Sequence, residues 1–117
     1  MSGTVAYHSG RVAEDMVAEH YIRRGFKIAH KRWRGRGGEI DLIARDGDAL
    51  IFIEVKKSRS FARAAERVSH RQIQRIFNTA SEFVSGEPNG QLTDMRFDVA
   101  MVDGQGRIEI LENALGV

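Results

Sequence analysis

Residues 38–56 read GEIDLIARDGDALIFIEVK, two apolar runs separated by a short polar turn. Two strand-like runs joined through a Gly-Asp pair are typical of a β-hairpin, here with a primed turn at Gly47-Asp48. If those two residues form the loop, facing residues have numbers that sum to 95. This register predicts that Asp41 faces Glu54 across the two strands.

Side chains alternate across a strand, so the register divides the hairpin between two faces of the sheet. The face expected to be wholly apolar comprises Ile40, Leu42, Ala44, Ile51, Ile53 and Val55. The other face carries Ile43, Leu50 and Phe52 near the turn and charged residues at the open end. A strand pair that is apolar on one face and half apolar on the other belongs in the middle of a covered sheet.

The charged open end of the hairpin is the candidate site of chemistry. Two carboxylates directly opposite each other, with β-carbons roughly 5 Å apart, repel, so Asp41 and Glu54 require a shared proton or a bound cation. Mg²⁺ prefers a couple of carboxylates together with waters and substrate phosphate oxygens. Lys56, expected opposite Glu39, is placed to assist a metal-bound water or stabilise developing negative charge. The alternative interpretation is that these four residues form solvated cross-strand ion pairs at a sheet end.

Length and composition predict one globular domain, residues 1–117, which can bury roughly two-thirds of its unfolded surface. The shares of hydrophobic (42%) and charged (29%) residues are those of a soluble protein. With no cysteine, disulfides and thiolate sites are excluded, and the histidines lack zinc-type spacing. No apolar run approaches the ~20 residues of a membrane span, and no secretory signal is evident. A cytoplasmic location is therefore the default expectation.

Basic residues concentrate on both sides of the hairpin in the sequence. Residues 23–36 contain seven Lys or Arg and no acid, and residues 56–75 contain seven more against one acid. Positive charge beside an acidic pair suits a polyanionic substrate that is held by its phosphates while a metal occupies the acids. The residues expected to contact nucleic acid are Arg32, Arg34, Arg36, Lys57, Arg59, Arg71 and Arg75.

Before the hairpin, the pattern predicts a helix and a short strand. The helix runs from Ser9-Gly10 to Arg24 and is stopped by the glycine that follows. It carries Glu14 in its first turns, where the helix dipole tolerates a negative charge. A strand at Phe26–His30 follows, and Lys31–Gly38 is expected to be a basic, glycine-rich loop.

The only tryptophan, Trp33, lies between arginines in that expected loop. It could stack on a base or a ribose. Such a side chain is more often an anchor beneath a loop, and this is the favoured interpretation. The glycines that follow do not make a phosphate-binding loop, because the chain enters a strand and not a helix.

After the hairpin, a second helix and two strands are expected. Ser69 and Gln72 make a capping box for a helix from about His70 to Val84. Strands follow at Arg96–Val102 and Arg107–Leu111, the last at a sheet edge. A strand–helix–strand unit of this length normally crosses over right-handed to give parallel strands. The chain is therefore expected to be an α/β fold, a mixed central sheet with flanking helices in the order α-β-β-β-α-β-β.

The order of acid, strand, turn and acid-x-Lys resembles the PD-D/E-x-K nuclease superfamily, here Ile40-Asp41 and Glu54-Val55-Lys56. Residues 9–114 resemble, more specifically, the YraN-type family of predicted endonucleases, which is similar to archaeal Holliday-junction resolvases. The matching residues are Gly10-Arg11, Glu14-Asp15, Ala18, Tyr21, Gly25-Phe26, Trp33-Arg34, Gly38–Ala44, Phe52–Lys56, Arg96–Val99 and Asn113-Ala114.

The resemblance implies a restriction-endonuclease-like fold and a Mg²⁺- or Mn²⁺-dependent endonuclease, with DNA favoured over RNA and branched DNA among its substrates. It implies that Asp41 and Glu54 are metal ligands aided by the Val55 carbonyl, with Lys56 the catalytic lysine and Glu14 an additional acid. The chain departs from the family pattern at Ile40, His70, Gln72 and Leu115. The rival hypothesis is a non-catalytic nucleic-acid-binding module with a nuclease-like fold, and a homodimer is compatible with either.

Overall fold

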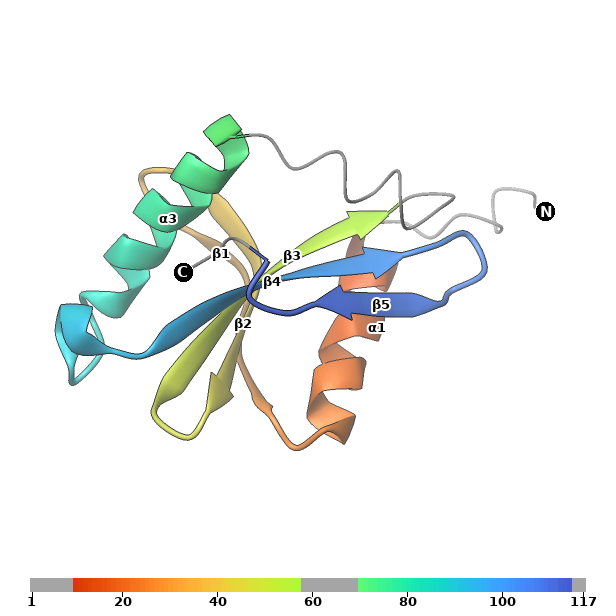
Figure 1. The fold of residues 1–117 in the computed structure, drawn as a ribbon, viewed down its shortest axis with the longest axis horizontal. Helices are drawn as coiled ribbons and strands as arrows, with labels where there is room; N and C mark the ends of the chain where they lie inside the picture. Colours follow the sequence, from red (N-terminus) through yellow and green to blue (C-terminus); the bar gives the residue numbers. More distant parts are fainter. Residues whose placement is uncertain (1–9, 58–69, 115–117) are drawn as a thin grey trace.

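The computed structural model describes residues 10–57 and 70–114, which form a five-stranded mixed sheet with two α-helices (Figure 1). In chain order the elements are α1 (Gly10–Arg23), β1 (Lys27–Arg34), β2 (Glu39–Asp46), β3 (Ala49–Lys57), α3 (His70–Val84), the 3-10 helix η2 (Gly90–Leu92), β4 (Met95–Val102) and β5 (Ile108–Leu111). The expected Ser69 cap and the basic residue Arg59 lie outside the described residues.

The strands lie side by side in the order β1-β2-β3-β4-β5. All neighbours are antiparallel except β3 and β4, which are parallel. The expected parallel pair and the expected edge position of the last strand are thus confirmed. Parallel neighbours need a long connection, and α3 lies within the segment that joins β3 to β4.

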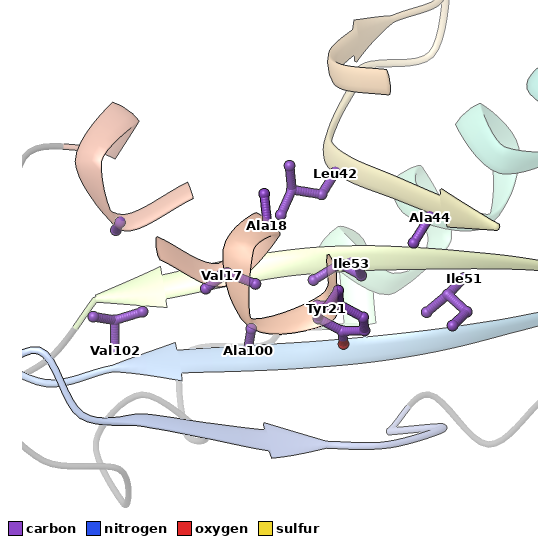
Figure 2. Packing of buried hydrophobic residues seen from close by; sticks show 10 residues of the cluster. Val17, Ala18, Tyr21, Leu42, Ala44, Ile51, Ile53, Ala100 and Val102 are labelled. Atoms are coloured by element: carbon purple, nitrogen blue, oxygen red, sulfur yellow. The ribbon is translucent and has the colours of Figure 1, made fainter. Parts of the chain in front are cut away.

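The sheet separates two apolar clusters, with one helix packed in each. Helix α1 contributes Ala13, Val17, Ala18 and Tyr21 to a cluster with Leu42, Ala44, Ile51, Ile53, Ala100 and Val102 (Figure 2). Helix α3 contributes Ile76, Ala80 and Val84 to a cluster with Ile40, Ile43, Leu50, Phe52 and Phe97. Coverage of both faces explains why β3 and β4 are apolar on both sides. Neither helix of the described residues combines the length and apolar character that crossing a membrane requires.

The hairpin of β2 and β3 keeps the predicted register only near its turn. Five pairs follow it, from Asp46 opposite Ala49 to Leu42 opposite Ile53, and Gly47 has the positive φ (63°) of a tight turn. The ladder ends there, so the predicted backbone pairs of Asp41 with Glu54 and of Glu39 with Lys56 are wrong.

Both β1 and β2 switch faces at one level of the sheet. Leu42 packs in the α1 cluster, whereas Ile40, expected on the same face, packs in the α3 cluster. In β1, Lys31 reaches Asp15 of α1, while Trp33 packs in the α3 cluster. Residues two apart in a regular strand share a face, so alternation fails at Arg32 and at Asp41.

The backbone of Arg32 supplies the reason for this switch. Its φ of 54° lies in the left-handed region, which L side chains rarely adopt. The neighbouring pairs, Lys31 with Leu42 and Trp33 with Ile40, place Arg32 opposite Asp41. A local irregularity in the edge strand therefore lies opposite Asp41, where the alternation of both strands fails, and the alternation of the sequence could not reveal it.

Strand β1 is longer than predicted, because Trp33 and Arg34 pair with Ile40 and Glu39 and are not part of a loop. The turn that follows is closed by the Gly35 N–H, which donates to the Gly38 carbonyl at 2.9 Å. Gly38 has φ 150°, and a β-carbon there would lie 2.9 Å from Arg75 Cγ, so this turn packs directly on α3. Beneath it Trp33 lies edge-on to Phe83, with ring centroids 5.2 Å apart, as the anchor interpretation predicts.

Candidate active site

Asp41 and Glu54 meet through their side chains, although their backbones are not ladder partners. The Val55 N–H donates to Asp41 Oδ2 at 2.8 Å. The Asp41 carboxyl group therefore occupies the place of a ladder acceptor where β2 and β3 separate. A hydrogen bond joins the two carboxyl groups, and the Glu54 side chain is only 14% exposed. The sequence thus correctly predicted that Asp41 meets Glu54. It predicted this from a backbone pairing of the two residues that the strands do not form.

The electrostatics of this acid pair are unfavourable to two full negative charges. Burial, followed by the charge of Glu54, raises the pKa of Asp41 to about 7, against the opposing effect of the Val55 N–H. Burial likewise raises the pKa of Glu54, although Lys56 and Gln72 oppose the shift. Near neutral pH the pair therefore retains a shared proton, one of the two compensations that the sequence required.

Two side chains contact Glu54 on the α3 side. Lys56 Nζ lies 3.9 Å from Glu54 Oε2, and Gln72 Nε2 donates to the same oxygen at 2.6 Å. Lys56 is thus beside the acid pair, as expected. Sequence reasoning missed the role of Gln72, because no pattern along the chain connects the first turn of α3 to the end of β3. Arg75, one turn further along α3, also lowers the pKa of Glu54.

Glu14 approaches the acid pair from α1. Its charge raises the pKa of Asp41, so the two groups are electrostatically coupled. Its carboxylate is 12% exposed and accepts a 2.6 Å hydrogen bond from Arg32 Nε. The first-helix acid therefore lies near the site, but with an arginine as its direct partner.

The acid pair fits a hard divalent cation in its chemistry. Buried carboxylate oxygens with incomplete counter-charge are the ligands that Mg²⁺ and Mn²⁺ accept, with the remaining positions left to waters and phosphate oxygens. Within residues 10–57 and 70–114, however, no three His, Cys, Asp or Glu side chains are grouped closely enough to hold a metal. Asp41 and Glu54 would therefore be the protein's carboxylate ligands in this conformation. That the Val55 carbonyl joins them stays a prediction.

The residues expected to bind nucleic acid are divided between the two sides of the acid pair. Arg32 lies on the α1 side with Glu14, and Arg75 lies on α3, within electrostatic reach of Glu54. The others that the structure describes are Arg34 (3.5 Å from Glu39), Arg36 after β1, Lys57 at the end of β3 and Arg71, exposed on α3. Their role in binding nucleic acid stays a prediction.

The fold and the site together define a class of small mixed α/β proteins with a buried acid pair and a lysine at the end of the central hairpin. The family model described as "Uncharacterised protein family UPF0102" matches residues 13–102. The match spans most of α1, all of α3, the first three strands and β4, and the chain belongs to this family.

Several proteins that carry the name of this family are similar over nearly the whole chain. A UPF0102 protein of Cereibacter sphaeroides is 62% identical over 114 residues, which cover 97% of either chain. One from Ruegeria pomeroyi is 58% identical over 97% of this chain and 93% of its own. One from Dinoroseobacter shibae is 50% identical over 95% of this chain and 83% of its own.

Proposed function

We propose that this protein is a metal-dependent endonuclease that hydrolyses phosphodiester bonds of nucleic acid, DNA in preference to RNA. The observation that carries the proposal is the buried contact of Asp41 with Glu54, with Lys56 Nζ 3.9 Å from the latter. Buried acids with raised pKa values and a specific charged neighbour are typical of functional sites. The mixed sheet flanked by α1 and α3 supports the finer proposal that the fold is restriction-endonuclease-like.

The roles of the residues follow from their contacts. Asp41 and Glu54 would hold a Mg²⁺ or Mn²⁺ ion, which activates a water and neutralises charge on the phosphate when bound. Lys56 stabilises the negative charge that develops on the phosphoryl oxygens. Gln72 fixes the orientation of the Glu54 carboxylate through its 2.6 Å hydrogen bond. Arg75, near Glu54 and at the surface of α3, can hold a neighbouring phosphate of the same strand.

The test is cleavage of flap, branched, single-stranded and duplex DNA with Mg²⁺ or Mn²⁺, together with Mn²⁺ binding measured by calorimetry. We expect the wild-type chain to bind Mn²⁺ and to cut at least one substrate, and Asp41→Ala to lose both activities while still binding DNA. Asp48→Asn is the matched control, because it removes a carboxylate from the exposed turn of the same hairpin. The proposal would be refuted if the wild-type protein cut none of these substrates and bound no Mn²⁺.

One observation favours the rival function, a nucleic-acid-binding module that does not cut. The oxygens of the acid pair already accept hydrogen bonds from Val55 and Gln72, so the pair is partly satisfied by the protein itself. A module of this kind binds DNA with a strong salt dependence through its arginines. It predicts that Asp41→Ala alters neither binding nor any other activity, whereas the nuclease predicts lost cleavage.

A further inference from the structure

Two residues that the sequence assigns to separate tasks bind each other in this fold. Glu14 is expected to be an additional acid of the catalytic site and Arg32 to hold nucleic acid, yet Arg32 Nε donates to Glu14 Oε1 at 2.6 Å. The same carboxylate is coupled to Asp41, whose pKa it raises. Each group is therefore withheld from its expected ligand by the other.

This ion pair differs from its neighbours in burial. Lys31 with Asp15 and Arg34 with Glu39 leave both partners well exposed, with the least exposed side chain at 38%. Exposed pairs of this kind contribute little to stability, because water screens both charges. In the pair of Arg32 with Glu14, by contrast, the carboxylate is 12% exposed. A partly buried carboxylate needs a partner, so its contact with Arg32 is not a casual surface contact.

The residue that makes this contact, Arg32, also has a strained backbone. Its φ of 54° lies in the left-handed region, which is strained for a residue that bears a side chain. The Arg32 guanidinium reaches the first turn of α1, where a β-carbon built on Gly10 would lie 3.5 Å from Arg32 Nη2. Positive charge is disfavoured at a helix N-terminus. The guanidinium is thus held by Glu14 in a place that is otherwise unfavourable for a cation and favourable for a phosphate.

We infer that Arg32 is a positioning residue that holds Glu14 off the metal site until a substrate phosphate takes its guanidinium. Phosphate competes well for a guanidinium, because it accepts two parallel hydrogen bonds. Glu14, once released, can move to the cation held by Asp41 and Glu54 as a third carboxylate. Metal and nucleic acid then bind cooperatively, each favouring the same state. This inference rests on the proposed function.

The test is a double-mutant cycle on Mn²⁺ affinity, measured by calorimetry on the full chain without nucleic acid. Arg32→Gln frees Glu14, so we expect about tenfold tighter Mn²⁺ binding. In that background Glu14→Gln should weaken binding at least about tenfold, whereas in the wild type it should change binding less than about threefold. If Arg32→Gln acted only by removing a positive charge, Glu14→Gln would weaken Mn²⁺ binding equally in the wild type and in the Arg32→Gln variant. Lys31→Gln, the matched control on the same strand, removes a cation from the exposed ion pair with Asp15 of α1 and should leave the affinity unchanged.

A second readout uses DNA binding in EDTA, followed by fluorescence anisotropy. Glu14→Gln should tighten binding because it releases Arg32, and Arg32→Gln should weaken it. If Arg32→Gln does not fold, Arg32→Gly replaces it, since glycine adopts a φ of 54° without strain. If the wild-type protein binds Mn²⁺ but the effects of Arg32→Gln and Glu14→Gln on its affinity are additive, this inference alone is overturned. Wild-type protein that binds no Mn²⁺ overturns the proposed function and the inference together.

Discussion

Asp98 on β4 is a buried carboxylate, and Asp41 and Glu54 at the end of the hairpin are partly buried ones, but the surroundings of these acids differ in more than exposure. Asp98 has no exposed side-chain surface. It accepts hydrogen bonds from the Tyr21 hydroxyl at 2.7 Å, from Arg96 Nε at 2.9 Å and from the Asn113 N–H at 3.0 Å. Asp41 accepts a hydrogen bond from the Val55 N–H, and Glu54 accepts one from Gln72. The two carboxyl groups also lie against each other, with Lys56 Nζ 3.9 Å from Glu54.

The comparison separates an acid that stabilises the fold from a pair that is available for chemistry. Asp98 joins α1, β4 and the chain after β5 through three donors, so its charge is compensated where it lies. In the acid pair burial and the charge of Glu54 raise the pKa of Asp41, and the charge of the pair is reduced by a retained proton. A cation could supply what the pair lacks, whereas nothing remains for a ligand to supply at Asp98.

The largest change in the free energy of unfolding is expected from a substitution at Asp98. Asp98→Asn leaves Arg96 without its carboxylate and should lower the free energy of unfolding by about 3 kcal/mol, measured by urea denaturation. The folded fraction should still bind Mn²⁺ as the wild type does. A loss below about 1 kcal/mol would show that Asp98 does not hold the fold together.

At the acid pair, replacing a carboxylate by an amide should raise the free energy of unfolding, whereas at Asp98 it lowers it. The pKa of Asp41 is raised in the fold from 3.8 to about 7, so wild-type stability is lost as pH rises between these values. Asp41→Asn has no charge to bury and can keep both hydrogen bonds. In EDTA it should therefore be more stable than the wild type by about 2 kcal/mol at pH 8, but not at pH 4. Equal destabilisation at both pH values would contradict the comparison.

A smaller effect should be visible in the titration of the pair. Glu54→Gln removes the charge that is second only to burial in raising the pKa of Asp41. We expect that pKa to fall by about one unit, a change of about 1.4 kcal/mol, in an NMR titration of the Asp41 carboxyl carbon. An unchanged Asp41 pKa would mean that burial alone sets it.

The smallest effect is expected when Asp98 loses one donor of several. Tyr21→Phe removes the 2.7 Å hydrogen bond but leaves those of Arg96 and Asn113. The free energy of unfolding should fall by about 1 kcal/mol, less than for Asp98→Asn. A loss as large as that of Asp98→Asn would show that Tyr21, and not the network, carries the site.

The sequence predicted the local features of the fold because short-range rules govern them. The Gly47-Asp48 turn sets the first five pairs of the hairpin, and the apolar period of α3 sets its extent from His70 to Val84. Helix α1 ends before Gly25, whose φ is 97°. The pairing of Asp41 with Glu54 was likewise found by counting, although the ladder ends before it.

Other features depend on contacts between segments that are distant in the chain. Alternation placed Ile40 on the same face as Leu42, but Ile40 packs in the α3 cluster, at a level of the sheet where Arg32 of the neighbouring strand has a left-handed backbone. Asp98 received no role from the sequence, because its donors lie 77 residues before it on α1 and 15 after it. The contact of Gln72 with Glu54 was missed for the same reason.

The sequence by itself determined which residues form the hairpin, the two helices and the acid pair, because turn chemistry and apolar periodicity act over a few residues. Only the tertiary structure decided how these acids are used. It buries Asp41 against Glu54, encloses Asp98 in donors and joins Glu14 to Arg32. Burial and proximity across the sheet set the energy of a charge, and neither is written in the local order of residues.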